Sequence, residues 1–204
     1  MIKSVLLTTD HVPDSISRAV EDMWGCKVFN HYGTTEMGLG GGVQCEACSG
    51  YHMRDADLYF EIVDPETGRL LPEGELGEIV FTTLTRKGMP LIRYRIGDLS
   101  RFVPGNCPCG STLRQMEVVR GRVAGRKRIA GEFFSIAELD EAIFQIDGVL
   151  NYRCELSEAQ GKEILTVDVV SVEGNPMAGD ALSQEVQRAV NHVPAVAKGL
   201  AEGR

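Results

Sequence analysis

The sequence contains no apolar run that could span a lipid bilayer and no basic stripe of the kind that binds nucleic acid. Its formal net charge at pH 7 is −8, and the apolar stretch near the N-terminus is too short for the hydrophobic region of a signal peptide. It also has no internal repeat, no low-complexity segment and no defensible Ser-His-Asp arrangement. These absences predict a cytoplasmic protein that binds neither membranes nor nucleic acids.

The 204 residues are 43% apolar and 25% charged, which is typical of a globular protein of one or two domains. A strand at residues 4–9, a helix at 14–24 and a strand at 27–31 form a βαβ pattern. This pattern indicates the edge of an α/β sheet, with Trp24 expected in the core at the end of the helix.

The middle of the chain favours an antiparallel sheet. β-Branched and aromatic residues cluster at 58–63 and 78–83, and turn residues follow each cluster. Two further strands are expected at 91–94 and 99–103.

After residue 121 the pattern changes to β-α-β-β-α. Strands are expected at 149–156 and 164–172 and helices at 135–145 and 180–192, the first helix beginning at a capping box of Ser135 and Glu138. We therefore expect an α/β and α+β fold in two domains. Residues 1–120 would form the edge of an α/β sheet domain with an antiparallel β subdomain, and residues 121–204 a small, mobile α+β domain.

Four of the six cysteines stand in two short motifs, which contain Cys45 with Cys48 and Cys107 with Cys109. An even number of cysteines could form disulfides, but the clustering and the lack of an export signal favour reduced thiols at a metal site. His52 adds a nitrogen ligand, and zinc takes four such ligands in a closed structural site. The residues alone leave open which four of these five would bind zinc.

The string Tyr-Gly-Thr-Thr-Glu at residues 32–36 follows a predicted strand and precedes a loop with four glycines among residues 38–42. Open α/β sheets bind ligands at such strand ends. The ring could stack on a base, a hydroxyl could bind a phosphate and the carboxylate could hold Mg²⁺, although this string alone would more often be an ordinary loop. Further along the chain, Asp98 ends a second string, Tyr-Arg-Ile-Gly-Asp, and could accept both hydroxyls of a ribose.

These two strings and Gly-Arg at residues 121–122, in this order, resemble the nucleotide-binding motifs of the adenylate-forming superfamily. Residues 62–68, 82–85 and 89–95 resemble the phenylacetate–CoA ligase branch in particular. The resemblance covers roughly residues 1–150, and the rest of the chain matches more weakly.

The resemblance implies a role for each motif residue. Thr35 would contact the phosphate of ATP or AMP and Glu36 would help to bind Mg²⁺, so these two are the expected catalytic residues. The glycines after Glu36 would line the acyl pocket. The nucleotide-binding residues would be Tyr32 stacked on adenine, Gly33 and Thr34 in the same loop, Asp98 on the ribose hydroxyls and Arg122 near the ribose or phosphate.

For the metal site, the resemblance selects Cys45, His52, Cys107 and Cys109, with Cys48 as a spare ligand or a replacement for His52. Four protein ligands leave no open coordination position, so we expect a structural zinc without a catalytic role.

The chain departs from the family pattern in three places. It contains no Ser/Thr/Gly-rich phosphate loop, and it has Ala124 where the family hinge usually carries an aspartate. Near the C-terminus, where the family has a Gly-Lys string, the only candidate is the reversed pair Lys198-Gly199. Full ligase activity by this chain alone is therefore not expected.

The leading hypothesis is part of an ATP-dependent acid–CoA ligase that activates a carboxylic acid, with aryl acids favoured, as acyl-AMP and transfers it to CoA. ATP or AMP, Mg²⁺ and CoA would then accompany the structural zinc. One alternative is a non-catalytic, zinc-stabilised binding or regulatory remnant of the fold; the other is a synthetase of the same branch that adenylylates a coenzyme. An exposed edge of the first sheet could also favour a homodimer.

Overall fold

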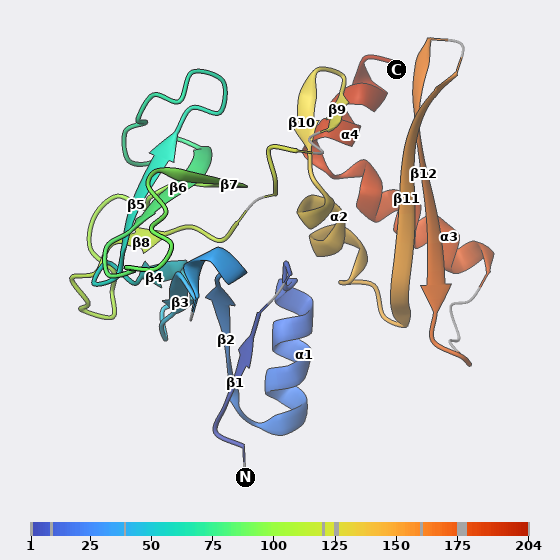
Figure 1. The fold of residues 1–204 in the computed structure, drawn as a ribbon. Coiled ribbons are helices and arrows are strands. Elements are labelled where there is room, and N and C mark those ends of the chain that lie inside the picture. Colours follow the sequence, from blue (N-terminus) through green and yellow to red (C-terminus); the bar gives the residue numbers. More distant parts are fainter. Residues whose placement is uncertain are drawn as a thin grey trace. The chain divides into compact units, whose positions relative to one another are not determined.

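The computed structural model describes residues 2–8, 10–38, 40–119, 121–124, 127–159, 161–174 and 179–203. The chain divides into two compact units (Figure 1). The first unit comprises Met1–Val12 and Ser17–Gly125, and the second comprises Pro13–Ile16 and Arg126–Arg204. No helix among the described residues is long and apolar enough to cross a membrane.

A five-stranded sheet of order β1-β2-β3-β4-β8 carries the predicted βαβ element. The strands β1 (Ser4–Leu7) and β2 (Lys27–Tyr32) are parallel, as a crossover through α1 (Asp14–Trp24) requires. The strands β3 (Gly42–Gln44), β4 (Tyr51–Met53) and β8 (Gln115–Met116) extend the sheet in antiparallel fashion.

The helix α1 buries none of its residues. The expectation that Trp24 lies in the core is wrong, because half of its surface, 50%, is exposed. Its apolar neighbour Met23 is 79% exposed. The helical periodicity of α1 was correctly predicted, but periodicity does not show whether a partner covers the apolar face.

The second sheet of the first unit has three antiparallel strands, β5 (Leu58–Val63), β6 (Gly77–Thr83) and β7 (Tyr94–Ser100). The two strands expected at 91–94 and 99–103 are wrong, because one strand runs between them. Its register on β6 shifts where Ile79 faces three residues of β7. Gly97, with φ +82°, lies in this bulge, and a left-handed backbone of this kind is accessible to glycine at little cost.

The core of the first unit is built from the inner faces of both sheets and from the short helix η1 (Thr35–Met37). Phe60, Phe81 and Met37 are each at most 1% exposed. The glycine loop and the cysteine motifs are therefore attached to a packed scaffold.

The second unit contains the predicted succession of elements. The hairpin of β9 (Lys127–Ile129) and β10 (Glu132–Phe134) precedes α2 (Ile136–Ile143), and the hairpin of β11 (Val149–Ala159) and β12 (Lys162–Ser171) precedes α3 (Asp180–Asn191). A further helix, α4 (Pro194–Ala201), was not predicted and carries Lys198 and Gly199.

The capping box at the start of α2 is confirmed. The Ser135 hydroxyl accepts from the Glu138 amide at 3.4 Å, and the Glu138 carboxylate accepts from the Ser135 amide at 2.9 Å. Leu139 and Ile143, both 0% exposed, then anchor the helix in the core of the unit.

Candidate nucleotide and metal sites

The bulge in β7 brings Asp98 to the end of β2. The Tyr32 hydroxyl donates to one Asp98 carboxylate oxygen at 3.0 Å, and Arg122 Nε lies 2.9 Å from the other. Arg122 also donates from Nη2 to the Ile96 carbonyl at 3.0 Å. Three residues that are far apart in the sequence thus meet at one buried carboxylate, which retains lone pairs for further donors.

Backbone pairing explains why these residues meet. The bulge releases Asp98 from the ladder with β6, and Asp98 instead forms an isolated antiparallel bridge with Arg122. The Leu99 amide donates to the Gly121 carbonyl at 2.9 Å, and the Val123 amide donates to the Gly97 carbonyl at 2.7 Å. The bulge therefore re-aims the carboxylate, as bulges beside functional sites often do.

Tyr32 is 7% exposed, and its ring stacks on Tyr51 with a centroid distance of 5.7 Å and an interplanar angle of 28°. Burial, and after it the charge of Asp98, raises the pKa of Tyr32 well above its ordinary value. Burial raises the pKa of Tyr51 to about 12. Tyr32 therefore remains a hydrogen-bond donor at every physiological pH.

The turn after β2 holds the expected phosphate and magnesium residues. Thr35 is exposed and Glu36 is partly buried, and neither side chain hydrogen-bonds another described residue. The Thr34 hydroxyl is buried and also has no hydrogen-bond partner in the described part of the chain. The turn thus holds two hydroxyls and a carboxylate that have no hydrogen-bond partner among the described residues.

The glycine loop packs directly on β2. Two hydrogen bonds from Arg54 fix the loop. Arg54 Nη2 donates to the Met37 carbonyl at 2.9 Å, and the Arg54 backbone amide donates to the Gly41 carbonyl at 2.8 Å. A Cβ added at Gly33 would lie 2.6 Å from Gly40 Cα, and one added at Gly40 would lie 1.9 Å from His31 Nε2. Side chains at these two positions would therefore push the loop away from the strand.

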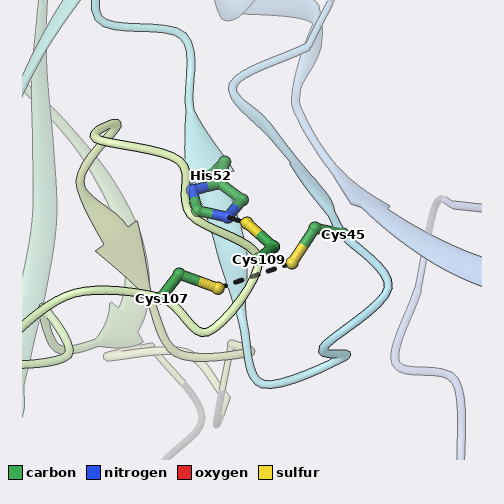
Figure 2. A group of neighbouring side chains, drawn as sticks. All are labelled: Cys45, His52, Cys107 and Cys109. Atoms are coloured by element: carbon green, nitrogen blue, oxygen red, sulfur yellow. Dashed lines mark hydrogen bonds between the residues drawn. The ribbon is translucent and has the colours of Figure 1, made fainter.

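Cys45, His52, Cys107 and Cys109 form a second cluster, whose ligand atoms all lie within 4.8 Å of one another (Figure 2). Cys45 follows β3 and His52 lies on β4, whereas the other two come from the loop before β8. Cys45 Sγ is 3.6 Å from Cys107 Sγ, and Cys109 Sγ is 3.2 Å from His52 Nε2. Tetrahedral zinc ligands would lie roughly 3.3–3.8 Å apart, so the donor set and spacing fit a structural zinc.

The surroundings of the cluster suit a metal as well. His52 Nδ1 lies 3.3 Å from the Leu113 carbonyl, and a proton there leaves Nε2 with its lone pair toward the thiols. Hydrogen bonds, first from the Cys109 amide and then from neighbouring side chains, lower the pKa of the Cys107 thiol to about 7. Cys48 is exposed and its thiol donates to the Cys45 carbonyl at 3.5 Å. It lies outside the group of four.

The structure thus places the expected nucleotide residues around β2 and the expected metal residues around β4. Sequence reasoning gave no role to Tyr51 or Arg54, which support Tyr32 and the glycine loop. No local pattern marks either residue, since each contact depends on the pairing of β2, β3 and β4.

No family model matches the chain. The chain is 36% identical to a phenylacetate-coenzyme A ligase of Aromatoleum evansii over 177 residues, which cover 83% of the chain and 40% of that relative. A phenylacetate-coenzyme A ligase of Thermus thermophilus is 31% identical over 194 residues, or 92% of the chain and 43% of the relative. The chain belongs to the phenylacetate–CoA ligase family. It matches the C-terminal part of the family and spans about two fifths of the length of these relatives.

Solved structures of acid–CoA ligases share the family fold. A 2-hydroxyisobutyryl-CoA ligase in the postadenylation state, in complex with R3-HIB-AMP, matches with a TM-score of 0.77 and 26% identity over 92% of the chain and 42% of the ligase. An anthranilate CoA ligase in complex with anthranoyl-AMP matches with a TM-score of 0.70 over 97% of the chain and 39% of that ligase. At 14% identity, the second match shows the fold alone.

Proposed function

We propose that the chain supplies the C-terminal portion of an ATP-dependent acid–CoA ligase. The observation that carries the proposal is the cluster of Tyr32, Asp98 and Arg122 beside the unpaired hydroxyls of the turn at 34–36. Membership in the phenylacetate–CoA ligase family supports the same activity, and it favours an aryl acid as the substrate.

In the proposed reaction, a carboxylate oxygen of the acid bonds to the α-phosphorus of ATP, and the bond to pyrophosphate breaks. The CoA thiol then loses its proton and bonds to the acyl carbon, and AMP leaves. Asp98 would hold the ribose hydroxyls with its remaining lone pairs, while Tyr32 would face the adenine. Thr35 would bind the α-phosphate, and Arg122 would stay close to the ribose. These contributions are mainly positioning and charge stabilisation.

Glu36 would bind Mg²⁺, which would neutralise charge on the phosphates when bound. Gly33 and Thr34 would complete the nucleotide loop. The glycine loop would bring bare backbone close to the acyl group, for which its lack of side chains is suited.

A zinc ion held by Cys45, His52, Cys107 and Cys109 would be structural. The four ligands join three segments of the first unit and leave no coordination position for a substrate. None of the six cysteines, all of which lie in the described part of the chain, forms a disulfide, which suits a reducing compartment such as the cytoplasm. The partners would be small molecules (nucleotide, acid and CoA), and a homodimer stays a prediction.

A non-catalytic, zinc-stabilised module of the same fold is the second candidate. It is favoured by the engagement of both Asp98 oxygens with protein donors. A coenzyme-adenylylating synthetase of the same branch would instead transfer the adenylyl group of ATP to a coenzyme, with release of pyrophosphate and no transfer to CoA.

Calorimetric titration of the chain with AMP distinguishes the leading proposal from the non-catalytic module. Asp98→Asn should weaken AMP binding by about tenfold, because the amide cannot accept from both ribose hydroxyls. Asp168→Asn, an exposed change on β12, is the matched control and should leave the affinity unchanged. Tyr32→Phe removes one donor to Asp98 and keeps the ring, so it should retain AMP binding. An unaltered chain that does not bind AMP would favour the non-catalytic module.

A further inference from the structure

Arg86 is a partly buried arginine in the segment that follows β6. Among the described residues, none forms an ion pair or a hydrogen bond with its guanidinium. Other arginines of the first unit are paired with carboxylates: Arg54 with Asp57, Arg93 with Glu61, Arg95 with Glu78, Arg101 with Glu117, Arg114 with Asp55 and Arg122 with Asp98.

Arg18 and Arg69 of the same unit also form no ion pair with a described residue, but both are exposed, whereas Arg86 is partly buried. Removing a guanidinium from water has a free-energy cost that a counter-charge normally offsets. Arg86 therefore has the charge state and the free donors to bind an anion from solution.

The location of Arg86 indicates where the anion would bind. A Cβ added at Gly38 would lie 2.8 Å from Arg86 Nη2, so the guanidinium occupies the space that a side chain at position 38 would need. Gly38 ends the short helix η1, and its amide donates to the Thr35 carbonyl at 3.2 Å. Arg86 thus lies beside the turn that carries Thr34 and Thr35.

This turn already holds donors without partners. The Thr34 hydroxyl is buried and has no described partner, and Thr35 is an exposed residue whose hydroxyl also has no described partner. The guanidinium comes from another segment and lies against the end of this turn at Gly38, so donors from two segments gather there. Buried donors of this kind are rarely left unsatisfied in a working site, and charged donors prefer anionic oxygens.

We propose that Arg86 binds the phosphate group of the adenine nucleotide at the turn of residues 34–38. The inference rests on the proposed function and adds to it a residue that neither the sequence motifs nor the site geometry had assigned. A terminal phosphate presents three acceptor oxygens, each able to accept more than one hydrogen bond, so it can bind both hydroxyls and the guanidinium. A carboxylate presents only two oxygens, and a guanidinium can bind a phosphate through two parallel hydrogen bonds.

Titration of the full chain with AMP and with adenosine tests this role. Arg86→Gln should raise the dissociation constant for AMP by about tenfold and leave that for adenosine unchanged, because only AMP carries the phosphate. Arg86→Lys keeps the charge without the planar fork and should recover part of the loss. The matched control is Lys87→Gln, which removes the same charge from the exposed neighbouring position and should change either affinity by less than about twofold.

Three results would overturn the inference while the proposed function stands. These are AMP binding that Arg86→Gln does not alter, an equal loss for AMP and adenosine, and a loss confined to CoA or to phenylacetate as the titrant. An unaltered chain that binds neither AMP nor adenosine would overturn the proposed function and this inference together.

Discussion

Replacing Cys109 by alanine should remove the bound zinc and destabilise the first unit. The change takes away one of four ligands and leaves His52 Nε2 without the thiol that lies 3.2 Å from it. Three remaining ligands do not fill a structural zinc site, so the metal should be lost at ordinary free-zinc concentrations.

The magnitude follows from the segments that the metal joins. Cys45 and Cys107 are 62 residues apart in the sequence, and zinc would cross-link them as a disulfide would. The loop-closure entropy of a cross-link over that distance corresponds to about 4 kcal/mol at 25 °C. For a protein of this size, that loss should lower Tm by about 10 °C.

Elemental analysis and calorimetry measure the two effects on the same samples. The unaltered chain, purified without added metal, should carry about one zinc per chain, and a chelator should lower its Tm by about as much as Cys109→Ala does. Cys48→Ala is the matched control, since Cys48 lies outside the cluster, and should retain the zinc. A folded chain with less than about a tenth of an equivalent of zinc would refute the metal site. Retention of zinc by His52→Ala together with its loss in Cys48→Ala would show that Cys48 replaces His52.

Three further predictions concern the second unit, the linker and the reaction. Ser135→Ala should destabilise the second unit by about 1 kcal/mol in thermal unfolding, because it removes the capping box of α2. The control Ser183→Ala, on the exposed face of α3, should change the stability by less than about 0.5 kcal/mol. Trypsin should cut first near residues 126–128, close to the division between the two units. Residues 125 and 126 lie outside the described part of the chain. An earlier cut within residues 58–103 would count against this boundary. The chain alone should release no pyrophosphate from ATP with a panel of aryl and short-chain acids, since this sequence lacks the phosphate loop. For the same reason it should bind ATP no more tightly than AMP. Pyrophosphate release that depends on one of the acids would contradict this prediction.

The sequence by itself determined the elements whose causes are local. The capping box at Ser135 and Glu138 was predicted, because both partners lie within one helical turn. The βαβ element at the N-terminus was predicted for the same reason, since each segment carries its own periodicity. The spacing of the cysteines pointed to a metal cluster, and the family resemblance selected the four residues that the structure brings together.

Only the tertiary structure decided which residues meet across the two sheets. The bulge at Gly97 turns Asp98 away from β6 and toward Tyr32 and Arg122, and it merges two expected strands into one. The packing of segments far apart in the sequence also places Arg86 against Gly38, and no described element buries Trp24. These contacts depend on register and on the packing of distant segments. The local patterns of the sequence do not encode them, because a shift of one residue in pairing would redirect every side chain of the strand.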